Sequence, residues 1–160
     1  MNRLFCLSAV VAAVGCSSTP VDVAGTYTIS VTDEANGCNL MNFNQGDSSS
    51  NIPVVVTQTG STMDAKITGG VGTYVTAVLG SSDFSGDVDG SSINATLFGT
   101  RSATSGGCSY TFNAILAGDL AGDALTGTIT YTPKTNGSPD CSAIEGCESV
   151  QNFNGTRPPR

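Results

Sequence analysis

Residues 84–96 read FSGDVDGSSINAT, and residues 116–128 read LAGDLAGDALTGT. Both fit one template: apolar, any, Gly, Asp, apolar, any, Gly, Ser or Asp, any, apolar, any, small, Thr. A shorter copy of its second half, GSTMDA, begins at Gly60, as GSSINA begins at Gly90 and GDALTG at Gly122. A glycine between two runs of alternating apolar and polar residues supplies the positive φ of a tight turn. The template therefore predicts three similar β-hairpins.

Alternating apolar and polar residues, which are typical of half-buried strands, also occur outside these copies. They occupy residues 21–31, 52–59, 72–80 and 108–116, and residues 148–157 are expected to add a last strand. The polar residues 33–51 predict a long loop, and residues 142–147 at most a single helical turn. We therefore expect about nine strands and no other helix.

The expected strands carry apolar residues on one face and mainly Thr, Ser, Asn and Asp on the other. The apolar face comprises Tyr27, Ile29, Val54, Val56, Met63, Ala65, Ile67, Phe84, Val88, Ile93, Ala95, Leu97, Tyr110, Phe112, Leu125, Ile129 and Tyr131. Sequential hairpins hide such a face by closing into a barrel, which also removes sheet edges. We predict an all-β, antiparallel up-and-down barrel of about eight or nine strands, with a β-sandwich as the alternative. The absence of Trp argues against a lipid-spanning barrel, which carries aromatic girdles.

The first residues have the features of an export signal. Arg3 precedes an uncharged, mostly apolar run at residues 4–14, which is shorter than the roughly 20 residues that a membrane-spanning helix needs. The run ends in Ala13-Val14-Gly15-Cys16, which resembles the lipobox of bacterial lipoproteins. That resemblance implies cleavage before Cys16 and lipid attachment to this cysteine, and the following Ser17 implies export to the outer membrane.

This leader divides the chain into three expected parts. Residues 1–15 are a signal peptide, residues 16–20 a lipidated tether, and residues 21–160 a single β-barrel domain. Two or more acyl chains anchor a protein stably, so we expect a lipoprotein of the cell envelope on the periplasmic or surface face of the outer membrane. The alternative is an ordinary cleaved signal in which Cys16 has no special role.

The mature chain is acidic. It has 13 acidic residues and, once Arg3 is removed from the six basic ones, five basic residues, which gives a formal charge of −8. The basic residues are scattered, whereas a nucleic-acid binder needs a basic patch. The sequence therefore predicts no nucleic-acid partner, and its contact with a membrane is expected to come from the lipid on Cys16.

Cysteine usage predicts two disulfides. Cys6 leaves with the signal and Cys16 takes lipid, so an even number remains in an exported chain: Cys38, Cys108, Cys141 and Cys147. The local spacing within DCSAIEGC favours Cys141–Cys147, which leaves Cys38–Cys108, while the crossed pairings stay open. Zinc is disfavoured because the chain has neither His nor a CxxC motif.

Residue types that support catalysis are scarce. The chain has no His, which removes the Ser-His-Asp and Cys-His arrangements, and Lys66 falls on the polar face of its strand. The acidic candidates are Asp83, Asp87 and Asp89 as a calcium loop, Asp33, Glu34 and Asp47 as a cation site, and Glu145 and Glu148 as a carboxylate pair. Turn chemistry and solvated loops explain these sets better. We expect a protein that is not an enzyme and that holds no metal or cofactor.

Gly25-Thr26-Tyr27 on the first strand resembles the Gly-x-Trp of lipocalin and calycin barrels, with Tyr in place of Trp. A barrel of this size has an interior that either is packed or holds one small ligand. Two hypotheses follow. The leading one is a non-enzymatic structural or interaction module of the cell envelope with an unidentified protein partner. The alternative is a carrier that binds a small apolar ligand inside the barrel.

Overall fold

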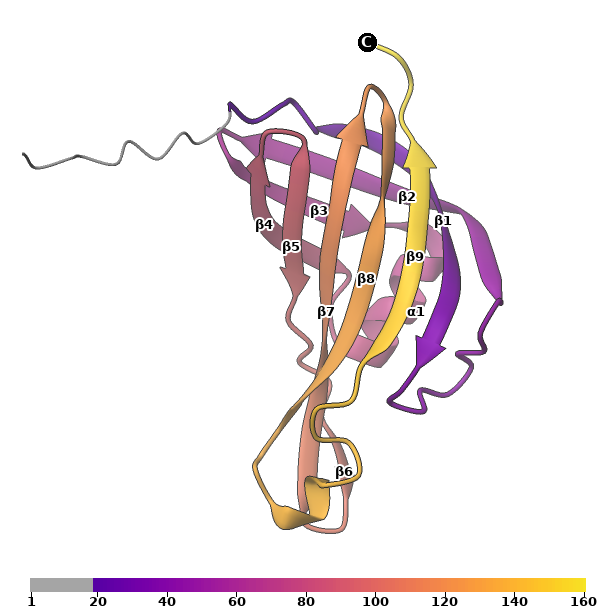
Figure 1. Cartoon of the computed structure of the whole chain (residues 1–160), viewed down its shortest axis with the longest axis vertical. Helices are drawn as coiled ribbons and strands as arrows, with labels where there is room; N and C mark the ends of the chain where they lie inside the picture. Colours follow the sequence, from indigo (N-terminus) through magenta and orange to yellow (C-terminus); the bar gives the residue numbers. More distant parts are fainter. Residues whose placement is uncertain (1–18) are drawn as a thin grey trace, which may run out of the picture.

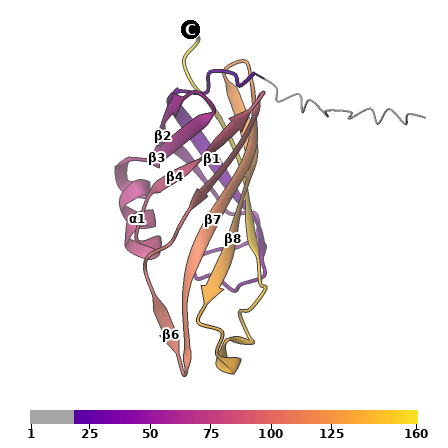
Figure 2. The ribbon, with the colours of Figure 1, turned by 90° about the vertical axis from the view of Figure 1, so that its left-hand side faces the viewer.

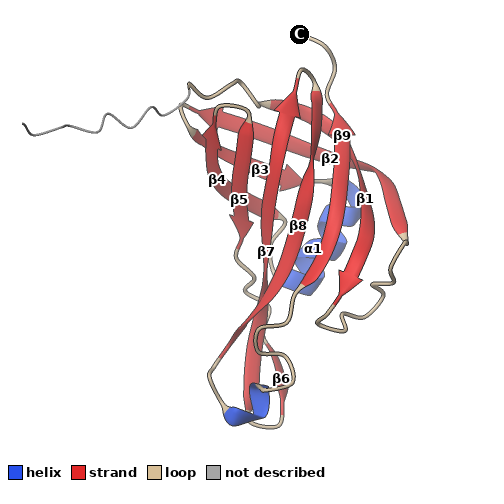
Figure 3. Ribbon diagram, in the orientation of Figure 1, coloured by secondary structure: helices blue, strands red, loops and turns tan. Residues whose placement is uncertain are grey.

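The computed structural model describes residues 19–160, and the expected lipidation site, Cys16, lies outside this range. Figure 3 shows a molecule built mainly of strands. The strands are β1 (Gly25–Asn36), β2 (Ser48–Thr59), β3 (Thr62–Ile67), β4 (Asp83–Asp89), β5 (Ser92–Leu97), β6 (Ala103–Ser105), β7 (Cys108–Ala121), β8 (Ala124–Thr135) and β9 (Ser149–Thr156). The helices are α1 (Gly69–Leu79) and the short 3₁₀ helix η1 (Pro139–Cys141). Neither described helix has the length and apolar character needed to cross a bilayer.

Eight strands close into an antiparallel barrel. Each pairs with its neighbour along the chain, from β1 to β5 and from β7 to β9, and the ring closes through the pairs β5–β7 and β9–β1. The ninth strand, β6, lies outside the ring and pairs with the first residues of β7 (Figure 1). The predicted all-β up-and-down barrel is thus confirmed, and the sandwich alternative is wrong.

The two ends of the barrel differ in construction. Two-residue turns join β2 to β3, β4 to β5 and β7 to β8 at one end, which we call the turn end and which is uppermost in Figure 1. The longer connections, residues 37–47, 68–82, 98–107 and 136–148, lie at the opposite end, which we call the loop end. The repeated template therefore builds the turn end, and the loop end consists of unlike segments.

Each tight turn places its glycine first. Gly60, Gly90 and Gly122 have φ values of 62°, 58° and 64°, and the residue after each has no positive φ. This combination is the pattern of a type II′ turn, whose twist matches that of paired strands. The three predicted hairpins are confirmed, with Gly90-Ser91 rather than Asp89-Gly90 as the two-residue loop.

The interior of the barrel is apolar, as the alternation predicts. The predicted apolar residues that are buried are Tyr27, Ile29, Val56, Met63, Ala65, Phe84, Val88, Ile93, Ala95, Leu97, Leu125 and Ile129. Val54, Ile67, Phe112 and Tyr131 are partly buried against this core. Tyr110 lies beyond it and packs edge-to-face on Phe112, with ring centroids 5.7 Å apart.

Phe153 of β9 fills the barrel beside two facing glycines. Gly118 of β7 pairs with Gly127 of β8, and a Cβ on these residues would lie 2.8 and 2.9 Å from the Phe153 ring. Carbon atoms do not pack this closely, so the aromatic ring can occupy this position only because both neighbours lack a side chain.

Arg157, which follows β9, closes the turn end. Its side chain is 7% exposed, and Nε lies 3.0 Å from Oδ1 of Asp123 in the β7–β8 turn. Its Nη1 donates to the carbonyl oxygens of Asp22 and Ala24 at 2.9 and 2.7 Å. The guanidinium also lies 5.7 Å from the ring centroid of Tyr27, which is fully buried. The end of the chain therefore fastens the beginning of the barrel to a hairpin turn.

The prediction of a strand at residues 72–80 is wrong, because this segment forms most of α1. The helix connects β3 to β4 beside the loop end (Figure 2). Its glycines disfavour a helix and its β-branched residues favour a strand, but burial decides: Leu79 is buried, and Val71 and Val75 pack against the core. Gly80 ends the helix in the left-handed conformation at φ 91°.

Two disulfides are present, but the favoured pairing is wrong. The bonds are Cys38–Cys147 and Cys108–Cys141, so neither Cys38–Cys108 nor Cys141–Cys147 forms. Barrel closure explains the first bond, because it brings the end of β1 beside the start of β9, where the Gly37 amide donates to the Glu148 carbonyl at 3.0 Å. The second bond ties the start of β7 to the connection that follows its partner strand, β8.

Candidate ligand-binding cavity

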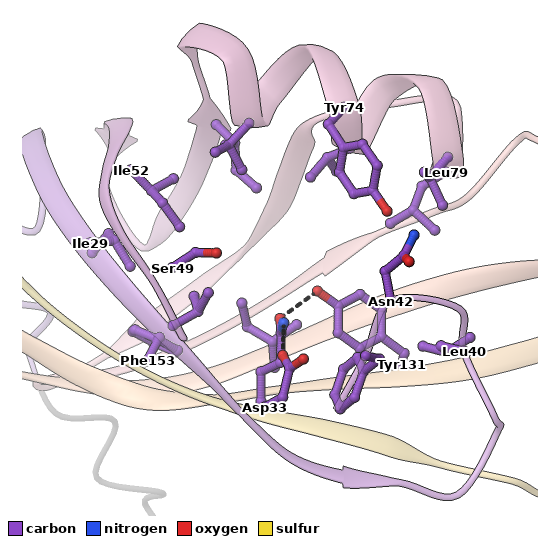
Figure 4. Close-up of a pocket in the computed structure, with 18 of the residues that line it drawn as sticks. Ile29, Asp33, Leu40, Asn42, Ser49, Ile52, Tyr74, Leu79, Tyr131 and Phe153 are labelled. Carbon is purple, nitrogen blue, oxygen red and sulfur yellow. Dashed lines mark hydrogen bonds between the residues drawn. The ribbon is translucent and has the colours of Figure 1, made fainter. Parts of the chain in front are cut away.

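The barrel is hollow toward its loop end. A cavity of about 720 Å³ lies between the sheet, α1 and the segment of residues 40–49. Figure 4 shows α1 on one side of this space and the strands on the other. Ligand pockets in proteins have volumes of roughly 300 to 1,000 Å³, so this cavity has the size of a site for a small molecule.

The cavity wall is mainly hydrocarbon. Its apolar residues are Ile29, Val31, Leu40, Met41, Phe43, Ile52, Val54, Ile67, Val71, Val75, Val78, Leu79, Phe84, Phe112, Leu116, Leu125, Ile129 and Phe153, with the ring carbons of Tyr74 and Tyr131. They come from the ring strands, from α1 and from the β1–β2 connection. None of the described residues that line the cavity is Lys or Arg.

Large apolar side chains border the opening of the cavity to solvent. Met41 of the β1–β2 connection is 87% exposed, and Tyr74 and Val78 of α1 are 55% and 49% exposed. All three also line the cavity, so we call them the mouth. In Figure 4, Asn42 extends from the same connection toward Tyr74 and Leu79. Apolar groups held in water at the entrance of an apolar cavity are typical of a binding site.

Asn36 positions the loop side of the mouth. Its Nδ2 donates to the carbonyl oxygens of Leu40 and Phe43 at 2.9 and 2.8 Å, and its Oδ1 accepts from the Leu40 amide at 2.7 Å. The same Oδ1 accepts from the Ser149 hydroxyl at 3.0 Å. Phe43 then packs edge-to-face on Tyr131, with ring centroids 6.3 Å apart. One amide side chain thus fixes the loop on β9 and against the cavity wall.

Helix α1 is seated by a close contact at its first turn. A Cβ on Gly72 would lie 2.3 Å from the Ile67 carbonyl oxygen, so only glycine allows the helix to start this near β3. Thr73 and Thr76 donate their hydroxyls to the helix carbonyls of Gly69 and Gly72 at 3.2 and 2.8 Å. These bonds satisfy the polar groups of residues that carry little helix propensity of their own.

Three polar side chains interrupt the apolar wall in a hydrogen-bonded chain. The Tyr131 hydroxyl donates to Oε1 of Gln151 at 2.7 Å, and Nε2 of Gln151 donates to Oδ1 of Asp33 at 2.6 Å (Figure 4). Asp33 is only 7% exposed. Burial, with the nearby Asp33 charge as a smaller cause, raises the pKa of the Tyr131 hydroxyl far above its ordinary value. Tyr131 is therefore a neutral donor at physiological pH.

Of the three acids in the predicted loop at residues 33–51, the fold places two at the cavity and one outside it. Asp33 and Asp47 both line the cavity, whereas Glu34 accepts from Asn152 at 2.7 Å on the exposed surface. The interpretation of Asp33 as a solvated loop residue is wrong, because β1 continues to Asn36 and places Asp33 inside. Asp47 is exposed and accepts from Asn44 at 2.8 Å.

The other acidic candidates lie away from the cavity. Asp83 is paired with Lys66 at 3.1 Å on the outer surface, and Asp87 and Asp89 are exposed on β4. Glu145 and Glu148 are exposed in the β8–β9 connection, and neither lines the cavity. The template positions Asp87 and Asp119 both face outward, and Asp119 accepts from Ser92 at 2.7 Å.

Sequence reasoning missed Asp33, Gln151 and the residues of α1 as parts of one site. The signal for Asp33 was present, because it continues the alternation of Tyr27, Ile29 and Val31 and so must point inward. No comparable signal marks α1, whose composition favours a strand. Comparison of the chain with protein families, curated proteins and solved structures finds no match.

Proposed function

We propose that this barrel is a carrier that binds one small, mainly apolar molecule in the cavity at its loop end. The observation that carries the proposal is the cavity of about 720 Å³, whose lining is mainly apolar. Protein interiors are close-packed, and empty space forfeits dispersion contacts and so lowers stability. An apolar ligand would restore those contacts, and it would be shielded from water by the barrel.

The mouth supports the same proposal. Met41, Tyr74 and Val78 are exposed large apolar side chains that also line the cavity. An apolar molecule that approaches the loop end would contact these side chains before it enters the barrel. A purely structural module, the leading hypothesis from the sequence, has no need for this combination of mouth and cavity, so the carrier hypothesis is the better supported of the two.

We further propose that Cys16 anchors the carrier to the outer membrane, as the lipobox-like leader implies. The described chain enters the barrel at the turn end, where the Val21 amide donates to the Gly90 carbonyl at 2.9 Å. The cavity opens near the other end, so the mouth would face away from the anchoring membrane. The substitution Cys16→Ser should move the protein from the membrane fraction to the soluble fraction. Retention in the membrane fraction would refute the anchor.

The carrier proposal can be tested with diphenylhexatriene, a hydrocarbon dye that fluoresces when it leaves water. We expect saturable binding of one dye molecule per protein chain. Leu116 lines the cavity. In the variant Leu116→Trp, the bulkier indole ring should therefore occupy the cavity and abolish most of this binding.

The matched control is Ile115→Trp. Ile115 is the neighbouring residue on β7, but it is 42% exposed and does not line the cavity. This variant should bind the dye as the unmodified protein does. Absence of saturable binding to the unmodified protein, or equal loss in both variants, would contradict the proposal.

A further inference from the structure

The polar chain inside the cavity ends in a hydrogen-bond acceptor that the protein leaves open. Among the described residues, Gln151 is the side chain that donates to the Asp33 carboxyl group, and it reaches Oδ1 only. Among residues 19–160, every fully buried side-chain oxygen or nitrogen has a hydrogen-bond partner. Oδ2 of Asp33 is therefore not fully enclosed by the described residues, and the side chain that carries it is part of the cavity lining.

The charged side chains that line the cavity in the described part of the chain are of one sign. Among residues 19–160, its lining contains two acids, Asp33 and Asp47, and no Lys or Arg. A carboxylate on a ligand would meet the negative charge of Asp33 in an environment of low polarity, where like charges repel more strongly than in water. An anionic head group such as that of a fatty acid would also find no counter-ion among the described residues of the lining.

A head group that donates hydrogen bonds would be attracted to Asp33 instead of repelled by it. An ammonium or hydroxyl group placed at Oδ2 would donate to the open carboxylate oxygen, and hydrogen bonds to a charged acceptor are stronger than those between neutral groups. Asp33 is held in place by Gln151, which in turn accepts from Tyr131. The acceptor is therefore oriented before the ligand arrives, which reduces the entropy lost on binding.

We infer that the ligand of this cavity is an apolar amine or alcohol, whose donor group binds Asp33, and not a fatty-acid anion. This inference rests on the proposed carrier function and specifies its ligand class. The observation that carries it is the open carboxylate oxygen of a side chain that is 7% exposed, in a cavity whose described lining has no Lys or Arg.

The test is displacement of diphenylhexatriene from the unmodified protein by decylamine, decanol and decanoic acid at neutral pH. These probes have the same hydrocarbon chain and differ in head group. The amine and the alcohol should each displace the dye at concentrations at least about tenfold lower than the acid, as one charge-assisted hydrogen bond implies. Displacement by the acid at equal or lower concentration would overturn the inference.

The variant Asp33→Asn keeps the shape of the side chain and an oxygen for Gln151 but removes the negative charge. The advantage of the amine over the acid should fall by about tenfold or more, while binding of the dye itself should persist. Asp47→Asn is the matched control, because it removes the same charge at an exposed position of the lining and should change the ratio by less than about threefold. Equal effects of the two variants would contradict direct contact with Asp33.

These results separate the two proposals. If the unmodified protein fails to bind the dye, the carrier function is wrong. If it binds the dye but prefers the acid, the carrier function holds and the inference about the head group is wrong. The ranking of the three probes needs no variant, so it decides the inference even if Asp33→Asn does not fold.

Discussion

At the scale of single residues, the Tyr131 hydroxyl contributes both to the stability of the fold and to the arrangement of the candidate site. It is buried beside Asp33, and its bond to Gln151 orients the polar end of the cavity. Burial also raises the pKa of Tyr27 at the closed turn end. For both phenols the neutral form is the one that the folded state accommodates, so alkaline pH acts against the fold.

Tyr131 makes the stability of the fold depend on pH in the alkaline range. Below its unfolded pKa of about 10, the hydroxyl is neutral in both states and its contribution to stability is complete. Above that pH the unfolded state loses the proton while the folded state keeps it, so the free energy of unfolding falls by up to about 1.4 kcal/mol per pH unit. We expect Tyr131→Phe to be about 1 to 3 kcal/mol less stable than the unmodified protein near neutral pH.

That stability gap should narrow as the pH rises above about 10, because Tyr131→Phe has lost one group whose ionisation opposes folding. Urea denaturation of both proteins from neutral to alkaline pH measures the gap. A gap that stays constant or widens above this pH would show that Tyr131 ionises at least as readily in the folded state as in the unfolded state.

Two glycines should respond to alanine in opposite ways. Gly118→Ala would place a Cβ 2.8 Å from the Phe153 ring and 2.7 Å from the Thr126 carbonyl oxygen, and we expect a loss of about 1 to 3 kcal/mol. Gly70→Ala meets no atom within 4 Å in α1 and should gain about 0.5 kcal/mol, because alanine has the higher helix propensity. Thermal or urea unfolding measures both changes. A gain for Gly118→Ala would contradict the close packing of Phe153.

At the scale of elements, the sequence predicts those parts that depend on local pattern. The alternation around Gly60, Gly90 and Gly122 is sufficient to predict the hairpins, because turn geometry and strand period are local properties. Helix α1 was missed because its β-branched residues favour a strand and its glycines disfavour a helix, and only the burial of its apolar side chains makes a helix the better solution. The disulfide pairing was missed although barrel closure, once predicted, already places β1 beside β9.

At this scale, the disulfide pairing is the clearest test of barrel closure between β1 and β9. Digestion of the unreduced protein should give peptides that join Cys38 to Cys147 and Cys108 to Cys141, identified by mass spectrometry. The double substitution of Ser for Cys38 and Cys147 should lower stability by about 5 kcal/mol in the chain-entropy model, and that for Cys108 and Cys141 by about 4 kcal/mol. Recovery of a Cys141–Cys147 peptide would contradict the arrangement of the loop end.

At the scale of the whole molecule, the two ends of the barrel have different roles. The turn end consists of three type II′ hairpins and is fastened by Arg157, and its interior is filled with side chains. The loop end holds α1, both disulfides and the cavity. Stability and recognition are therefore located in different parts of one continuous sheet, so the loop end can keep an open interior without opening the ring.

The site could be predicted only in part from the sequence. The inward residues follow from alternation, and Asp33 could have been placed among them. Whether the interior is filled depends on how far α1 and the segment of residues 40–49 stand from the strands, which is a property of the packed molecule. The distinction between a packed and a hollow barrel therefore had to come from the structure.

The central claim, a hollow barrel that takes an apolar molecule inside, is tested most directly by methyl NMR of the isoleucines during titration with diphenylhexatriene. Ile29, Ile52, Ile67 and Ile129 line the cavity, whereas Ile115 and Ile144 do not. We predict that the δ1 methyl signals of the first four shift in a saturable manner and that those of Ile115 and Ile144 stay in place. Shifts confined to Ile115 or Ile144, or none at all, would contradict the claim.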